Sequence, residues 1–172
     1  VLGEAEYSSN DEQAHLEETI VYGKATKKVG IASSSSEGLV ALADFNTRPI
    51  LRIGELAEML PGMVATQHSG EGKANQYFLR GMNLDHGTDF SMWVEGMPIN
   101  LRAHAHGQGY LDLNFIIPEL VESARYSKGP YKASNGDFSS AGSSSISLYG
   151  SIPQPLISVT LGTEQYRRLL AA

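Results

Sequence analysis

Cysteine is absent from the 172 residues of the chain. Disulfide bonds and thiolate metal sites are therefore excluded, and the composition suits a protein that meets an oxidising compartment. No run of eighteen apolar residues occurs, so the sequence predicts no membrane-spanning helix. No segment has the pattern of a signal peptide, and we expect the sequence to be a mature form if the protein is exported.

Clusters of lysine and arginine are also missing. The formal net charge of −6 comes from the first 18 residues, which contain six acidic residues and neither lysine nor arginine. The rest of the chain has 13 acidic and 13 basic residues. This balance argues against nucleic acid as a partner, and it predicts a flexible acidic arm over residues 1–16.

A short β-prone segment, EETIVYG at 17–23, follows the arm, with Thr19, Ile20, Val21 and Tyr22 closed by Gly23. An accessible segment of this kind can add as an extra strand to the sheet edge of a partner. The alternative is an ordinary edge strand of the domain itself. Residues 24–38 are rich in Lys, Ser, Ala and Gly, and we predict that they form a linker.

The region 52–62 has the pattern of a helix. Apolar residues recur at i, i+3, i+4 and i+7 from Ile53 to Leu60, and a Pro-Gly pair at 61–62 ends the pattern. Glu55 and Glu58 fall on the opposite face, where solvated side chains are more expected than catalytic ones.

Short strands separated by turns dominate the remainder. We predict one strand over 77–82, a turn over 83–88, a return strand over 89–95, a helical turn from Pro118 to Val121, a strand over 123–127, a loop over 133–145 and a last strand over 145–150. These elements predict an α+β domain over residues 39–150, with a mixed sheet of about four strands and short helices. Residues 156–162 alternate weakly between apolar and polar.

Three strings, YFLRG at 77–81, WVEGMPIN at 93–100 and YSKGP at 126–130, follow EETIVYG in a fixed order. With these motifs, roughly residues 17–150 resemble the plug domain of TonB-dependent outer-membrane receptors. The resemblance implies a plug inside an outer-membrane β-barrel, gating energy-coupled uptake of a siderophore, metal or metal complex. It implies that residues 17–23 are the TonB box, facing the periplasm and bound by TonB.

The resemblance also assigns the remaining segments. Residues 151–172 would be the start of the barrel strand region or a tail, and the barrel of a full-length receptor is absent from this chain. Arg80 matches the arginine of the family's FIRG strand, so it is implied to contact the barrel wall. Lys128 stands where the family usually has arginine, and an ammonium group cannot make the same bidentate pair.

Strand direction predicts how the histidines are grouped. If 77–82 and 89–95 are adjacent antiparallel strands, the loops at 65–76 and 99–113 lie at the same end of the domain. His86, in the intervening turn, would lie at the opposite end. The resemblance implies that the two loops face outward and contact the ligand, through Gln67, His68, His104, His106, Gln108 and Tyr110.

The same loops carry a candidate metal site. In extended backbone, His104 and His106 point to one face, and His68 would add a third imidazole. Asp112 or Glu71 would supply a carboxylate, which together makes a ligand set for zinc, nickel or copper. Histidines in polar loops can instead serve as hydrogen-bonding groups. Gln67, Gln108 and Tyr110 in the same loops are equally suited to donate hydrogen bonds to a siderophore. No cofactor is expected beyond a transported metal ion or ferric siderophore.

Enzyme motifs are incomplete. His104-Ala105-His106 is followed by Gly-Gln-Gly, whereas a metallo-β-lactamase needs His-x-His-x-Asp-His. A Gly-x-Ser-x-Gly nucleophile elbow is absent, and SGEGKAN at 69–75 lacks the spacing of a phosphate-binding loop. We therefore predict that the chain is not an enzyme. The competing interpretation is a stand-alone periplasmic or surface module that binds a ligand or metal through the same loops.

Overall fold

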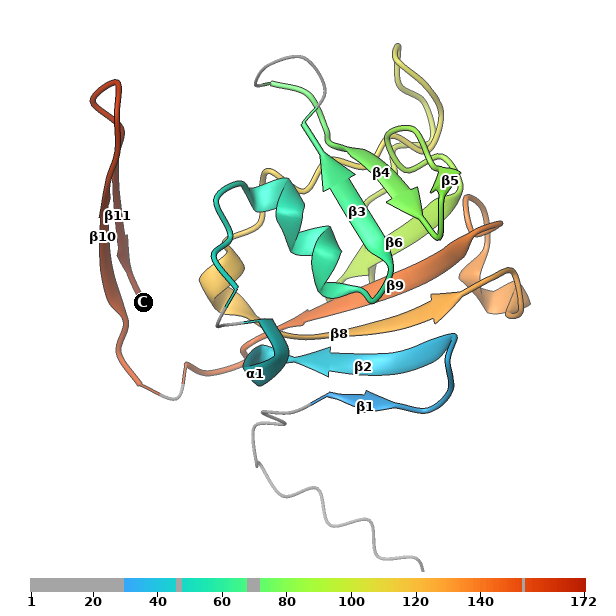
Figure 1. The fold of residues 1–172 in the computed structure, drawn as a ribbon, viewed down its shortest axis with the longest axis horizontal. Coiled ribbons are helices and arrows are strands. Elements are labelled where there is room, and N and C mark those ends of the chain that lie inside the picture. The colour runs from blue at the N-terminus through green and yellow to red at the C-terminus, as the bar shows by residue number, and fades with distance from the viewer. Residues whose placement is uncertain (1–29, 46–47, 68–71, 153) are drawn as a thin grey trace, which may run out of the picture.

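The computed structural model describes residues 30–45, 48–67, 72–152 and 154–172 (Figure 1). The acidic arm and the predicted TonB box, Thr19 to Gly23, lie outside the described residues. A six-stranded mixed sheet is the largest element. Its strands, in spatial order, are β1 (Ile31–Ala32), β2 (Glu37–Ala41), β8 (Val121–Lys128), β9 (Gly142–Leu148), β6 (Phe90–Val94) and β7 (Met97–Pro98).

A second, three-stranded antiparallel sheet lies over one face of the first, together with a 3-10 helix, η1 (Ile53–Met59) (Figure 1). Its strands are β3 (Met63–Thr66), β4 (Gln76–Leu79) and β5 (Met82–Asn83). The other helical segments are α1 (Leu42–Phe45), η2 (Pro118–Leu120) and η3 (Ala133–Asn135). The predicted α+β class is confirmed, although the described residues contain more strands than the four expected.

The hydrophobic core fills the space between these two layers. Alternate residues of β4, Tyr77 and Leu79, are buried against the core, and Phe90, Val121 and Ile146 belong to the same cluster from the larger sheet. Burying each of these side chains contributes roughly 1.5–3 kcal/mol. The period-2 pattern of the strands therefore determines which face of each sheet meets the other layer.

A two-residue turn at Arg80-Gly81 separates β4 from β5. Both residues have positive φ, 52° and 80°, as a type I′ hairpin turn requires. Phe78 pairs with Asn83 across this turn, so the prediction of one continuous strand over 77–82 was wrong. The string at 93–100 contains a turn of the same kind: Glu95 and Gly96 both have positive φ, and they join β6 to the short edge strand β7.

The predicted antiparallel pairing of 77–82 with 89–95 was also wrong. Both edges of β4 are occupied, by β3 and β5, and β6 pairs in parallel with β9 in the other sheet. Residues 84–89 carry the chain between the layers: the amides of Gly87 and Thr88 both donate to the carbonyl of Leu84. Because the tight turn pairs β4 with β5, no edge of β4 is left for β6, and β6 pairs in the larger sheet instead.

The predicted linker at 24–38 is structured where it is described. Residues 31–32 and 37–41 are strands of the larger sheet, and the four serines between them form the turn. The hydroxyl of Ser34 accepts hydrogen bonds from the amides of Ser36 and Glu37. Serine favours such local side-chain bonds, so the composition that suggests a linker here makes a tight connection instead.

A serine-rich composition misled the prediction at 133–145 as well. Strand β9 begins at Gly142, inside the predicted loop, and ends at Leu148. It lies between β8 and β6, so its backbone groups are paired on both sides. A Cβ on Gly142 would lie 2.5 Å from the carbonyl oxygen of Ser127, which explains glycine at this close approach.

The apolar stripe of 52–62 is buried as predicted, although the helix is of the 3-10 type. Glu55 and Glu58 have structural roles: Glu55 accepts from the amide of Leu51, and Glu58 accepts from the amide of Ala65 and pairs with Arg48. Among the described residues, no helix is long and apolar enough to cross a membrane.

The C-terminal residues form a hairpin of β10 (Ile157–Leu161) and β11 (Arg167–Ala171), which stands beside the two layers in Figure 1. Arg168 reaches from β11 to Glu119 with two hydrogen bonds, of 2.5 and 2.8 Å. These bonds from Arg168 hold the pKa of the Glu119 carboxyl below its usual value. The ion pair therefore links the hairpin to the segment before β8.

Close packing at Gly54 generates a first prediction. A Cβ at this position would lie 1.9 Å from Oδ1 of the buried Asn75. Gly54→Ala is expected to lower the free energy of unfolding by about 1–3 kcal/mol, measured by urea denaturation. Gly107→Ala is the matched control, because its Cβ would meet nothing within 4 Å. Equal stability of the two variants would contradict the packing described for Gly54.

Candidate functional site

The 99–113 loop lies against the 84–89 turn. The amide of Leu111 donates to the carbonyl of His86 at 2.7 Å, and the rings of His86 and His106 are 4.4 Å apart between centroids. The prediction that His86 lies at the opposite end from His104 and His106 was therefore wrong. It depended on an antiparallel pairing of two strands that belong to different sheets.

Asn100 fixes the base of this loop. Its Oδ1 accepts from the amide of Met92 at 2.8 Å, and its Nδ2 lies 3.0–3.1 Å from the carbonyl oxygens of Gly87, Phe90 and Gly109. One amide side chain thus joins the turn, strand β6 and the far end of the loop. Sequence reasoning gave Asn100 no role, although it is the last residue of the WVEGMPIN string at 93–100.

Tyr110 contacts the rings of three histidines, His86, His104 and His106, which together are called the histidine group. Its ring stacks on His104, with centroids 4.0 Å apart and an interplanar angle of 17°. Its hydroxyl oxygen accepts from the amide of Ala74 at 2.7 Å, and the side chain is buried. Tyr110, predicted to contact a ligand directly, therefore ties the 99–113 loop to the segment that precedes β4.

His86 is held in a defined orientation. Its ring is buried, and Nδ1 lies 2.9 Å from the carbonyl oxygen of Ala74 and 3.1 Å from that of Asn75. Carbonyl oxygens only accept hydrogen bonds, so we assign the proton to Nδ1. The other ring nitrogen, Nε2, lies 3.7 Å from Oδ1 of Asp85.

Within the described residues, one group of side chains has the spacing of metal ligands. Asp85, His86 and His106 each offer an atom within 4.8 Å of the others. His104, which the sequence paired with His106, is not in this group. Its Nδ1 instead accepts from the amide of His106 at 3.2 Å.

The other predicted ligand residues are dispersed. His68 and Glu71 lie outside the described residues. Gln108 is exposed and Gln67 is half-buried. Asp112 accepts from the amide of Asn114 at 2.9 Å. Burial raises the pKa of the nearby Tyr77 hydroxyl, and the charge of Asp112 adds to the effect.

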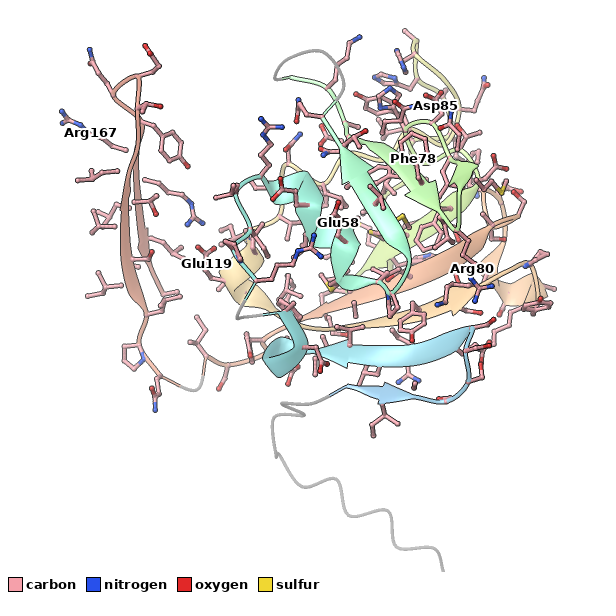
Figure 2. All side chains as sticks on the ribbon, in the orientation of Figure 1. Glu58, Phe78, Arg80, Asp85, Glu119 and Arg167 are labelled. Carbon is pink, nitrogen blue, oxygen red and sulfur yellow. The ribbon has the colours of Figure 1, made fainter. Side chains whose placement is uncertain are left out.

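Arg80 lies away from the histidine group, as the labels of Arg80 and Asp85 show in Figure 2. It donates to the carbonyl of Ser35 at 3.1 Å and to Ser36 Oγ at 3.3 Å. Lys128 is buried nearby and donates to the carbonyl of Pro61 at 3.1 Å. Burial, and then the charge of Arg80, lower the pKa of Lys128. Both cations thus hold neighbouring segments of the domain together.

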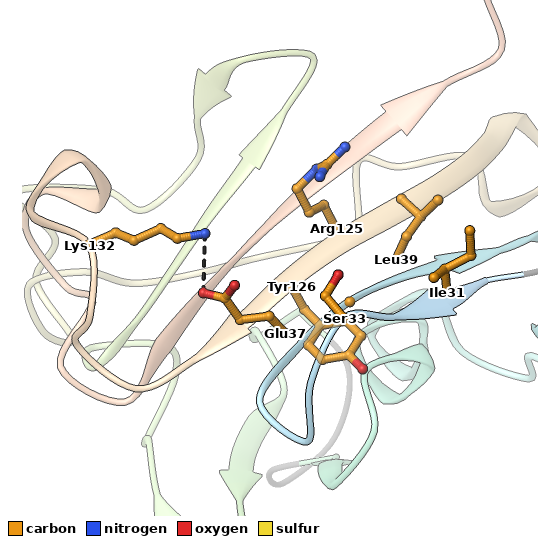
Figure 3. A pocket seen from close by; sticks show the side chains of 8 residues that line it. Ile31, Ser33, Glu37, Leu39, Arg125, Tyr126 and Lys132 are labelled. Atoms are coloured by element: carbon orange, nitrogen blue, oxygen red, sulfur yellow. Dashed lines mark ion pairs between the residues drawn. The ribbon is translucent and has the colours of Figure 1, made fainter. Parts of the chain in front are cut away.

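A shallow hollow lies beside β1, β2 and β8 (Figure 3). The carboxylate of Glu37 pairs with Lys132 at 3.1 Å and accepts from Ser127 Oγ at 3.0 Å. The hydrogen bond from Lys132, with that from Ser127, lowers the pKa of Glu37. These contacts connect the first hairpin of the domain to the turn that follows β8.

Solved structures with a similar fold include siderophore receptors. The siderophore receptor PirA from Acinetobacter baumannii matches with a TM-score of 0.53 and 23% identity, over 73% of this chain and 19% of its own length. The ferric enterobactin receptor PfeA from Pseudomonas aeruginosa, a mutant in complex with enterobactin, gives 0.54 and 18%, over 78% and 21%. The ferric yersiniabactin uptake receptor FyuA from Yersinia pestis gives 0.52 and 17%, over 72% and 18%.

These likenesses concern the fold, and the chain spans about a fifth of the length of each receptor. The family is shown by a separate comparison. The sequence model of the TonB-dependent receptor plug domain matches residues 30–143, well over half of the chain. Its range includes the smaller sheet, the 99–113 loop and the larger sheet except for most of β9. The chain therefore belongs to the TonB-dependent receptor plug domain family.

Proposed function

We propose that the chain is the plug of an outer-membrane transporter, and that it gates the energy-coupled uptake of a siderophore, metal or metal complex. The observation that carries this proposal is the two-faced hairpin of β10 and β11. A plug acts only inside a barrel, and this hairpin has the side-chain pattern of barrel strands.

One face of the hairpin is apolar and exposed to the surroundings. Its large apolar residues have exposed fractions of 66–77%, and they are Ile157, Val159, Leu161 and Leu169. The strand register places Val159 directly opposite Leu169. The other face presents Ser158, Thr160 and Arg168 together with Leu170, and Arg168 binds Glu119 of the plug. Strand β10 alternates throughout, whereas in β11 Arg167 pairs with Leu161 on the apolar face, next to the turn of the hairpin. Apolar-out and polar-in alternation is the pattern of a strand between lipid and a barrel lumen.

The competing function, a stand-alone periplasmic or surface binding module, does not account for this face. A water-exposed module would leave four large apolar side chains unburied on a single two-stranded ribbon. Isolated ribbons of this size are marginally stable in water. Placement in an outer membrane gives the same side chains a lipid environment.

The ligand would be met at the end of the plug that carries the 99–113 loop. His106 and Gln108 are exposed there on a loop whose base is fixed by Asn100. A fixed base with exposed polar side chains is suited to ligand contact. The receptors with similar folds include one solved with enterobactin, which supports a siderophore as one cargo class. The proposed role is transport gating, with no catalytic step.

Pulling by TonB would act first on the weakest attachment of the N-terminal segment. Strand β1 pairs with β2 through two residues, whereas β2 pairs with β8 through five. A single carboxylate oxygen of Asp44 also accepts from the amides of Gly30 and Ala41, at 2.7 and 2.9 Å. Force applied N-terminal to Gly30 would therefore peel β1 away before it disturbs the central strands.

The TonB box itself generates a prediction. If Thr19, Ile20, Val21, Tyr22 and Gly23 add as a strand to TonB, Ile20→Pro removes a backbone donor and fixes φ. Titration of the chain with a soluble periplasmic TonB fragment should show binding that the variant reduces at least about tenfold, a loss of roughly 1.4 kcal/mol.

Ala14→Pro is the matched control, because it places the same residue in the acidic arm outside the box. It should bind TonB as the unchanged chain does. Unchanged TonB affinity in Ile20→Pro would show that TonB does not bind this segment as an added strand.

The hairpin faces generate a third prediction. In a full-length receptor carrying this chain, Val159→Arg should lower the free energy of unfolding from lipid vesicles by about 2–4 kcal/mol, since it places a charge in the apolar core of the bilayer. Ser158→Arg, one residue away on the other face, should have a much smaller effect. Urea titration in vesicles measures both, and equal effects would contradict the assignment of the lipid-facing side.

A further inference from the structure

We infer that Asp85, His86 and His106 form a binding site for a divalent transition metal ion, with zinc as the best-matched member of the class. Two imidazoles and one carboxylate are ligands that zinc prefers. The site deepens the proposed function, because a metal held here would be cargo in transit. Metal binding itself does not depend on TonB or on a barrel.

His86 has the supporting contacts of a metal-binding histidine. Such residues donate their second ring N–H to a backbone carbonyl or carboxylate, which fixes the tautomer and the direction of the ligating nitrogen. Nδ1 of His86 is 2.9 and 3.1 Å from two carbonyl oxygens, and Nε2 is on the side of Asp85. The ring is buried, so its orientation is set by the fold.

Asp85 is positioned by its backbone. Its φ is 49°, its amide donates to Asn83 Oδ1 at 2.8 Å, and its carbonyl accepts from the amide of Tyr77 at 2.8 Å. These bonds hold the residue in a left-handed conformation beside His86. The carboxylate itself is more than half exposed, so an ion can approach it from solvent.

His106 comes from the other side of the site, on the exposed 99–113 loop. Its ring meets His86 edge to face, at an interplanar angle of 77°. The three ligand atoms lie within 4.8 Å of one another. A tetrahedral zinc ion with bonds of about 2.0–2.1 Å holds its ligand atoms roughly 3.4 Å apart. An inward movement of the exposed loop by up to about 1.4 Å would close the site.

This site differs from the His104–His106 pair that alternation in the sequence suggests. The stacking of His104 on Tyr110 and the hydrogen bond to its Nδ1 give that ring a structural role in the loop. Three protein ligands also leave a fourth position for water or for a group of a chelator. Such an open site suits reversible binding better than a closed four-ligand site.

The experiment is a calorimetric titration of the full 172-residue chain with zinc chloride alone. Cobalt(II) in place of zinc reports imidazole and carboxylate coordination by its visible absorption. We expect one ion per chain. Asp85→Asn and His106→Ala should each weaken binding by at least about tenfold. Asparagine suits the left-handed backbone at position 85, so the fold is retained.

His86→Asn tests the third ligand, since the side-chain amide can still donate to the carbonyls of Ala74 and Asn75. It should also lose binding, with circular dichroism confirming the fold. His104→Asn is the matched control, because Oδ1 can replace Nδ1 as the acceptor from His106. It should leave zinc affinity unchanged.

The site would be overturned by a lack of zinc binding to the unchanged chain, or by binding that Asp85→Asn and His106→Ala leave intact. Loss in His104→Asn together with retention in Asp85→Asn would also overturn it, in favour of the alternating pair. The zinc titration contains no TonB, so it tests the metal site independently of the proposed function. If the chain binds zinc but does not bind the TonB fragment, the proposed function is rejected and the metal site stands.

Discussion

The two-residue turn at Arg80-Gly81 is the constraint on which the arrangement of this plug depends. It pairs β4 with β5 at once, so that both edges of β4 are occupied. The next segment therefore cannot pair with β4, and residues 84–89 carry the chain across to β6 in the larger sheet. This crossing creates the two layers, and it places His86 between the small sheet and the 99–113 loop.

The chemistry of the domain follows from that crossing. Asn100 and Tyr110 are buried or partly buried polar groups, and each satisfies backbone groups of a different segment. Leaving such backbone groups unpaired would cost about 1–3 kcal/mol each, so these side chains fix the loop firmly at its base. The exposed part of the loop carries His104 and His106, of which His104 stacks on Tyr110. A fixed base that presents exposed polar side chains is suited to ligand contact.

Several features could be predicted from local pattern. The buried stripe of 53–60, the helical turn at Pro118 and the strand ending near Lys128 all depend on neighbours in sequence. Two errors share one cause. Composition suggested a linker at 24–38 and a loop at 133–145, whereas β1, the start of β2 and the start of β9 lie inside those ranges and have their backbone groups paired with other strands. The composition of a segment is a local property, whereas its pairing as a strand depends on which other strand of the chain lies next to it.

The sequence by itself determined the family, the α+β class and the histidine-bearing loop, because ordered motifs and residue types are local properties. Only the tertiary structure decided which histidines meet. Strand partners are set by turns and by competition for sheet edges, so His86 and His106, 20 positions apart, share a ligand group to which His104 does not belong. A ligand set is a property of three-dimensional distance, and no spacing along the chain encodes it.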